Sequence, residues 1–227
     1  MQYKNLAIDF GAVAVFGLLA KFDLDKQKEL GSQVDDKIAK TKERKAQRAG
    51  LKQREQQLGT LSLEITVGPE RTQQASVREL QAGASQHLIV VIGPRKACKD
   101  ALIGANLLKM DFAMSNVLVV PYETDKDSMD AEIRPTGTGF GQQPTYETQP
   151  YVARPTGDGW DEWCMAEMSD AVAQNGETTR TEGIAIVVAN NGKVIRRGVG
   201  KVPWRQMVEQ LEEEVSGKSK KEEGSFF

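Results

Sequence analysis

The sequence predicts an α/β domain that follows an N-terminal transmembrane helix and a basic helical tether. Three observations predict this organisation: an apolar run near the N-terminus, a stretch rich in lysine and arginine after it, and short apolar runs that alternate with helical patterns in the remainder. The predicted parts are the membrane helix at 1–24, the tether at 25–59, the domain at 60–216 with a long loop at 122–159, and a charged tail at 217–227.

The composition excludes several classes of function. The chain has 227 residues and a formal net charge of −2, so its overall charge gives no nucleic-acid signal. His87 is the only histidine, which excludes a metal site with several histidines on this chain. It opens an apolar strand, and we interpret it as structural. The only cysteines, Cys98 and Cys164, lie far apart in sequence and do not indicate a disulfide framework.

Residues 6–20 form the apolar run, which only Asp9 interrupts. A helix of this length spans about 22 Å, and its flanking residues lengthen it towards the roughly 30 Å hydrocarbon core of a bilayer. Ala7, Gly11 and Ala14 share one helix face, which lets a partner helix approach closely. We expect Asp9 to face that partner or a lipid headgroup, because a carboxylate is unfavourable in hydrocarbon. A buried soluble helix and a signal peptide are the alternatives.

The tether is strongly basic, with eight lysines and arginines against one acidic residue over residues 37–54. Basic residues that follow a membrane helix favour anionic lipid headgroups. A plain solvated helix is an equally weighted alternative, and nucleic-acid binding is disfavoured because no aromatic residues interleave the charges. The residues predicted to contact lipid or a partner are Lys37, Lys40, Arg44, Lys45 and Arg48.

The first half of the domain reads as a β-α-β unit. Residues 61–67 alternate between apolar and polar side chains, which predicts a half-buried strand added before the unit. Residues 87–92 and 117–120 are continuous apolar runs, typical of strands covered on both faces. Residues 94–114 between them show helical spacing, so we expect the two strands to be parallel.

The second half predicts a helix, a hairpin and a final helix. The helix covers residues 160–174, and the hairpin joins residues 184–188 to 194–197 through Asn190-Asn191-Gly192, a strong turn signal. The last helix covers residues 203–215. This order of elements is that of the thioredoxin-like fold.

A thioredoxin-like fold normally carries a Cys-x-x-Cys motif at the start of the helix after its first core strand. Here Cys98 takes the place of the second cysteine and Arg95 that of the first, and no proline precedes Ile184. Dithiol exchange is therefore not expected. Cys98 is either a lone redox-sensitive thiol or a small buried residue, and we favour the second interpretation.

Trp160 and Trp163 follow the long loop. The two tryptophans are predicted to contact a partner at the rim of this loop, although burial in the core is the favoured alternative.

Three segments resemble the C-terminal region of the Low PSII Accumulation proteins: residues 5–16 (NLAIDFGAVAVF), 54–59 (REQQLG) and 117–121 (VLVVP). The resemblance runs over residues 5–125 and is weaker over 160–215. It implies a thylakoid membrane protein of the chloroplast that assists photosystem II assembly, with its domain on the stromal side and with photosystem core subunits and thylakoid lipids as partners. The family has a further membrane helix upstream, and plant members carry tetratricopeptide repeats before it. Neither is present in this sequence.

The leading hypothesis is therefore a non-catalytic assembly factor or accessory subunit of a photosystem, with photosystem I as a further option. We expect no intrinsic cofactor, and leave open a contact of chlorophyll or carotenoid with the membrane helix. The alternative is a membrane-tethered thiol oxidoreductase or peroxidase-like enzyme that uses Cys98. A third hypothesis is a scaffold held on a lipid surface by the basic helix.

Overall fold

The computed structural model describes residues 26, 37–38, 41–42, 45, 49–68, 71–125 and 147–216. The chain divides into two compact units, residues 1–52 and 53–227. The predicted membrane helix at 1–24 lies outside the described residues. Within the described ranges, no helix combines the length and apolar character that crossing a bilayer requires.

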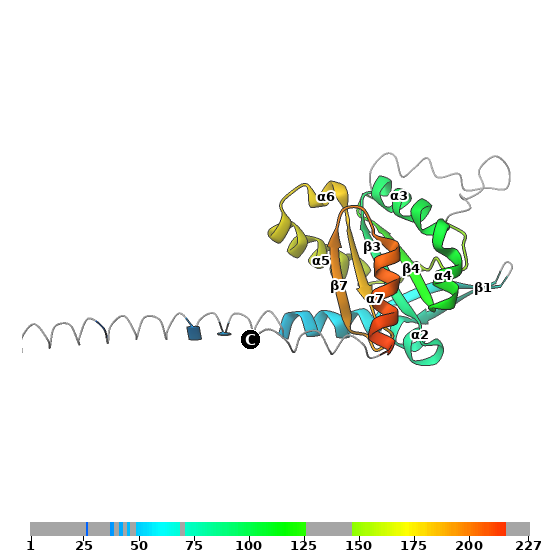
Figure 1. The fold of residues 1–227 in the computed structure, drawn as a ribbon, viewed down its shortest axis with the longest axis horizontal. Helices are drawn as coiled ribbons and strands as arrows, with labels where there is room; N and C mark the ends of the chain where they lie inside the picture. Colours follow the sequence, from blue (N-terminus) through cyan, green and yellow to red (C-terminus); the bar gives the residue numbers. More distant parts are fainter. Residues whose placement is uncertain are drawn as a thin grey trace, which may run out of the picture. The chain divides into compact units, whose positions relative to one another are not determined.

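The second unit is built on a four-stranded sheet with the order β4-β3-β6-β7 (Figure 1). β3 (His87–Gly93) pairs in parallel with β4 (Val117–Glu123), and antiparallel with β6 (Ile184–Val188) on its other side. β6 continues through the predicted hairpin into β7 (Val194–Val199). This strand order and direction, in a β-α-β unit followed by a β-hairpin and helix, confirm the predicted thioredoxin-like fold.

Helices cover both faces of the sheet, as the continuous burial of β3 requires. α3 (Arg95–Ala105), η1 (Asn106–Leu108) and α4 (Lys109–Met114) connect β3 to β4, and together with α7 (Trp204–Ser216) they cover one face. α5 (Trp160–Asn175) covers the other face. Successive β3 residues alternate between two hydrophobic cores, since neighbouring side chains of a strand point to opposite faces.

β4 is longer than the sequence predicts, because it continues through Pro121 to Glu123. The N–H of Val119 points away from β3 and donates to the carbonyl oxygen of Tyr151 at 2.8 Å. Residue 121 has its nitrogen on the same outer edge, where a proline removes no bond to β3. The extension carries the chain to Asp125, beside the start of α3.

A second sheet, with the order β2-β1-β5, lies outside the thioredoxin-like core. β1 (Ser62–Gly68) was predicted, whereas β2 (Arg71–Ser76) and β5 (Arg154–Thr156) were not. α2 (Val77–Ala84) and the short α6 (Thr179–Glu182) were also missed.

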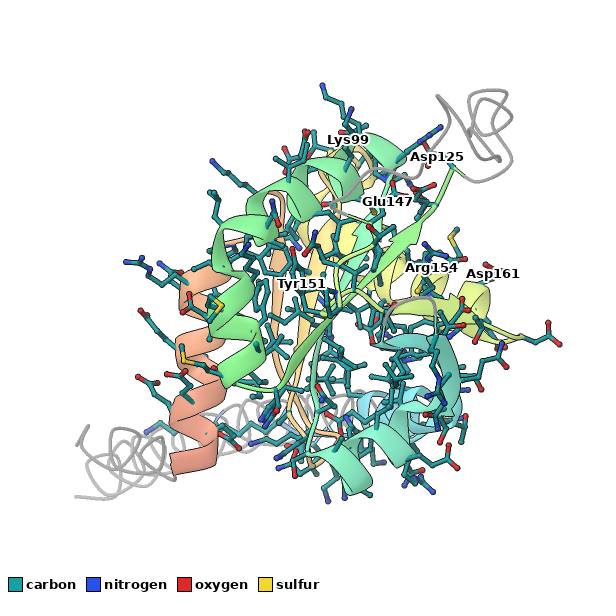
Figure 2. All side chains as sticks on the ribbon, turned by 90° about the vertical axis from the view of Figure 1, so that its right-hand side faces the viewer. Lys99, Asp125, Glu147, Tyr151, Arg154 and Asp161 are labelled. Atoms are coloured by element: carbon teal, nitrogen blue, oxygen red, sulfur yellow. The ribbon has the colours of Figure 1, made fainter. Side chains whose placement is uncertain are left out.

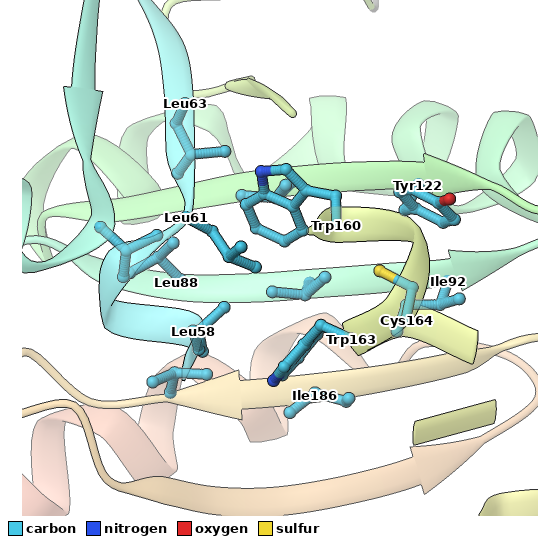
Figure 3. Packing of buried hydrophobic residues seen from close by; sticks show 14 of the residues in the cluster. Leu58, Leu61, Leu63, Leu88, Ile92, Tyr122, Trp160, Trp163, Cys164 and Ile186 are labelled. Carbon is cyan, nitrogen blue, oxygen red and sulfur yellow. The ribbon is translucent and has the colours of Figure 1, made fainter. Parts of the chain in front are cut away.

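The two tryptophans that we placed at the loop rim are core residues instead. Trp160 and Trp163 are only 2% and 3% exposed, and their rings meet edge to face (Figure 3). The Trp160 indole N–H donates to the carbonyl oxygen of Ser62, and that of Trp163 donates to Arg54. Both polar atoms are satisfied inside the protein, so neither ring offers a surface for a partner. The helical end of the tether, residues 53–59, consequently packs with the domain.

Candidate functional site

The site lies where β3 and β4 end and α3 begins. β3 stops at Gly93, and Pro94 has the extended backbone (φ −62°, ψ 156°) of a residue that precedes a helix. The N–H of Cys98 donates to the Pro94 carbonyl at 3.1 Å, which closes the first turn of α3. The site therefore forms at the edge where a thioredoxin-like fold carries its cysteine motif.

Cys98 is 1% exposed, and backbone oxygen atoms surround its thiol. Its Sγ lies 3.4 Å from the carbonyl oxygen of Tyr122, 3.5 Å from that of Gly93 and 3.8 Å from that of Val91. Burial, followed by the negative charges of Glu123 and Asp125, raises the pKa of the Cys98 thiol to about 12. At neutral pH this group is a thiol that donates to carbonyls, not a nucleophilic thiolate.

Asp125 supplies the N-terminal cap of α3 from a distant part of the sequence. Pro94 has no side-chain group to accept the first helical N–H groups, and the Asp125 Oδ1 accepts the N–H of Arg95 at 2.8 Å instead. Figure 2 shows Asp125 at the end of β4, close to the start of α3. Arg95 and Lys96 are positively charged, which is unfavourable at the positive end of the helix dipole. The negative charge of Asp125 offsets part of this unfavourable interaction in the first turn.

Cys164 lies on the other side of the sheet from Cys98. Cys164 belongs to the core formed with Ile92 and Trp160 (Figure 3), whereas Cys98 belongs to the core formed with Val91. Neither cysteine is in a disulfide. Since the main chain of the sheet separates the two thiols, they cannot pair in this fold.

The loop before β6 touches the end of β3 directly. Gly183 has φ +79°, and a Cβ atom built on it would lie 2.9 Å from the carbonyl oxygen of Ile92. No peptide bond in the described ranges is cis. Two glycines, Gly93 and Gly183, thus allow the close backbone approach at this end of the sheet.

A cleft of about 790 Å³ lies next to this site, bounded by α3 and by the loops that precede β6 and follow β7. Ala97, the neighbour of Cys98, belongs to its wall, whereas Cys98 itself does not. Its apolar lining consists mainly of Val91, Ala101, Ile184, Val202 and Trp204. Its charged residues are Lys96, Asp100, Glu182 and Lys201. Among the described residues, no three His, Cys, Asp or Glu side chains are grouped to hold a metal ion.

The residues that the sequence singled out are not brought together by the fold. Lys37 and Lys45 are exposed helical residues of the first unit, and Trp160 and Trp163 are buried. The remaining predicted partner or lipid contacts lie outside the described residues: Ala7, Asp9, Gly11, Ala14, Lys40, Arg44 and Arg48.

Asp125, Glu123 and the charged residues of the cleft were missed. Acidic residues directly after an apolar strand are the one sequence signal that points to Glu123 and Asp125.

No protein-family model matches the sequence, and no curated protein matches it. Solved structures with a similar fold include the mitochondrial 2-Cys peroxiredoxin of Plasmodium falciparum, at 11% identity and a TM-score of 0.45, covering 72% of this chain and 93% of that one. Thioredoxin peroxidase I of Plasmodium yoelii has 12% identity and a TM-score of 0.45, with coverage of 73% and 91%. Mycobacterium tuberculosis AhpC has 12% identity and a TM-score of 0.40, with coverage of 70% and 89%. At this identity the likeness concerns the fold alone.

These comparisons correct the leading functional prediction. The solved structures of similar fold include peroxiredoxins and a thioredoxin peroxidase, which stands against the predictions of a non-catalytic photosystem assembly factor or accessory subunit and of a chain that is not an enzyme. The likeness itself assigns no activity to this chain. The resemblance to the Low PSII Accumulation family, the thylakoid location and the lipid and pigment contacts stay predictions.

Proposed function

We propose that this chain is a thiol enzyme of the peroxidase class in which Cys98 reacts with a hydroperoxide. The observation that carries the proposal is the position of Cys98 in the first turn of α3, directly beyond β3. A thioredoxin-like fold carries its reactive cysteines there, and the N–H groups of a helix N-terminus stabilise a thiolate. The neighbouring cleft gives a substrate an approach to this turn.

The reaction is a two-electron oxidation of the thiol. The Cys98 thiolate attacks one peroxide oxygen, an S–O bond forms while the O–O bond breaks, and water or an alcohol leaves after taking up a proton. The product on the protein is a sulfenic acid. Two equivalents of an external thiol then reduce it, forming one disulfide and one water. Cys164 cannot serve as the resolving thiol, because it lies on the opposite face of the sheet.

Reaction requires the first turn of α3 to open. In the closed arrangement burial is the largest cause of the raised pKa of Cys98, so exposure of the sulfur to water lowers that pKa towards its ordinary value. Opening this turn breaks the bond between the Arg95 N–H and Asp125. We therefore expect turnover to become independent of peroxide concentration once opening limits the rate.

The test is peroxide consumption by the purified full chain, with dimedone to trap sulfenic acid and mass spectrometry to locate the adduct. We expect hydrogen peroxide or cumene hydroperoxide to produce an adduct at Cys98, and the Cys98→Ser variant to lose thiol-dependent peroxide consumption. A serine hydroxyl can donate to the same carbonyl oxygens, so this variant should stay folded.

Cys164→Ala is the matched control, since it removes the other buried thiol from the opposite core. It should retain peroxide consumption, with thermal unfolding checked in parallel. Peroxide consumption no faster than that of free cysteine, or an equal loss in both variants, would refute the assignment.

A further inference from the structure

The cleft beside α3 is preformed. Its two loops are joined by the Gly200 N–H, which donates to the Gly183 carbonyl oxygen at 2.9 Å. Its wall between α3 and α7 is fixed by Trp204, which is 6% exposed and whose indole N–H donates to the Ala101 carbonyl oxygen at 3.1 Å. Gly104 leaves room for this ring, because a Cβ there would lie 3.2 Å from the indole nitrogen. A ligand therefore meets ordered walls and loses little free energy in organising them.

The cleft contains charged residues of both signs, and these residues do not form ion pairs with one another. Lys96 and Asp100 come from α3, Glu182 is the last residue of α6, and Lys201 lies in the loop after β7. Within the part of the chain that the structure describes, none of the four forms an ion pair. The Glu182 carboxylate lies close to the loop after β7, because its Oε2 is 3.3 Å from the position that a Cβ atom on Gly200 would occupy. Two ammonium groups and two carboxylates thus remain available to a ligand.

The volume, apolar residues and charges of the cleft indicate the kind of ligand that it can bind. A volume of about 790 Å³ lies within the range of roughly 300–1,000 Å³ that is typical of small-ligand sites. The apolar lining, with Trp204 and Val202, suits a hydrocarbon side chain, and charges of both signs suit a molecule that carries both an ammonium and a carboxylate.

We infer that the cleft binds a short peptide with free ends. The peptide carboxylate faces Lys96 and Lys201, its ammonium group faces Asp100 and Glu182, and an apolar side chain packs towards Trp204. This binding does not depend on the chemistry of Cys98, so the two proposals fail separately.

The experiment is a calorimetric titration of the full chain with the tripeptide Ala-Leu-Ala and with its N-acetylated and C-amidated forms. We expect the free peptide to bind, and each blocked form to bind more weakly by roughly threefold to tenfold, as partly exposed charge pairs give. A higher salt concentration should weaken the binding of the free peptide more than the binding of the two blocked forms. The Cys98→Ser variant should bind the free peptide with unchanged affinity.

Lys96→Glu and Lys99→Glu make a matched pair of variants. Both lysines are exposed on α3, but only Lys96 lines the cleft; Figure 2 labels Lys99. We expect Lys96→Glu to raise the Kd for the free peptide by roughly threefold to tenfold, and Lys99→Glu to leave it within about twofold. No binding at millimolar peptide, equal binding of free and blocked peptides, or an equal loss in both variants would overturn the inference.

Discussion

The carboxylate of Asp125 acts on Cys98 in two ways. It accepts the Arg95 N–H and so stabilises the turn that covers the sulfur, and its charge adds to burial and to Glu123 in raising the pKa of the thiol. Both effects keep Cys98 unreactive while the turn is closed. The side chain that controls this thiol is therefore not on the same helix but at the end of a neighbouring strand.

Replacing Asp125 should make Cys98 more reactive. Loss of an N-cap destabilises a helix end by about 0.5–2 kcal/mol, which corresponds to roughly 2- to 30-fold more opening of the first turn. We expect the rate of iodoacetamide labelling of Cys98 to rise by that factor in Asp125→Ala, and by less in Asp125→Asn, which keeps an acceptor for the Arg95 N–H. Labelling of Cys164 in the same samples provides the control. A labelling rate of Cys98 that is the same in all three proteins would contradict this role of Asp125.

At the scale of elements, continuous apolar runs in the sequence predicted the core strands. The elements without such runs, β2, β5, α2 and α6, were not predicted. β3 and β6 are continuous apolar runs, so their burial followed from the sequence. β2 is polar and exposed, and is a strand because β1 offers it an edge to pair with. Ser76 and Glu79 form a capping box that starts α2, and this spacing of a serine and a glutamate is a local signal in the sequence for the start of a helix.

The same contrast applies to the site. Cys98 could be named as the reactive residue of the alternative hypothesis because its position relative to the first core strand is a local feature of the sequence, although a small buried residue was the favoured interpretation. The sequence did not predict Asp125 as the group that caps this turn and acts on the thiol. Asp125 lies 30 residues from Arg95, and the two meet only once β4 has paired with β3. The cleft combines three separate segments and has no local signature.

Two glycines test how much the contact between β3 and the loop before β6 contributes to stability. Gly176 (φ 94°, ψ 173°) and Gly183 (φ 79°, ψ 173°) end successive helices with nearly the same backbone conformation, one that only glycine adopts readily. A Cβ on Gly176 meets nothing within 4 Å, whereas one on Gly183 lies 2.9 Å from the Ile92 carbonyl oxygen. Gly176→Ala therefore isolates the backbone strain.

We expect Gly176→Ala to lower the free energy of unfolding by about 1–3 kcal/mol. Gly183→Ala should lower it further, because a backbone carbonyl cannot move aside as a flexible side chain can. Urea unfolding followed by circular dichroism measures both values. Equal losses in the two variants would mean that the close approach at Gly183 is not a constraint on the fold.

At the scale of the whole molecule, several buried polar side chains among the described residues are held by partners from distant segments. Glu167 is 2% exposed, and its two carboxylate oxygens accept from the Arg197 guanidinium at 2.8 and 3.1 Å. Arg54 lies 3.5 Å from the same carboxylate, so it joins the end of the tether helix to α5 and β7. His87, at the start of β3, is buried in the same way and accepts the Asn190 N–H at its Nδ1, 3.1 Å away.

His87 should make the stability of the whole domain depend on pH. Burial lowers the pKa of His87 below its ordinary value of 6.5, so the unfolded chain binds a proton more readily than the folded one. The stability contribution of the neutral imidazole is therefore complete above about pH 6.5 and is lost as the pH falls from there towards the folded-state pKa. Protonation also places a hydrogen on Nδ1, which then can no longer accept the Asn190 N–H. We expect the free energy of unfolding in urea to fall more steeply between pH 7.5 and pH 5.5 for the natural sequence than for His87→Gln, whose amide oxygen can accept the same N–H without titrating. Parallel pH profiles for the two proteins would show that His87 binds the same number of protons in the folded and unfolded states over this range, so that its pKa is not lowered by folding and other groups set the acid sensitivity of the domain.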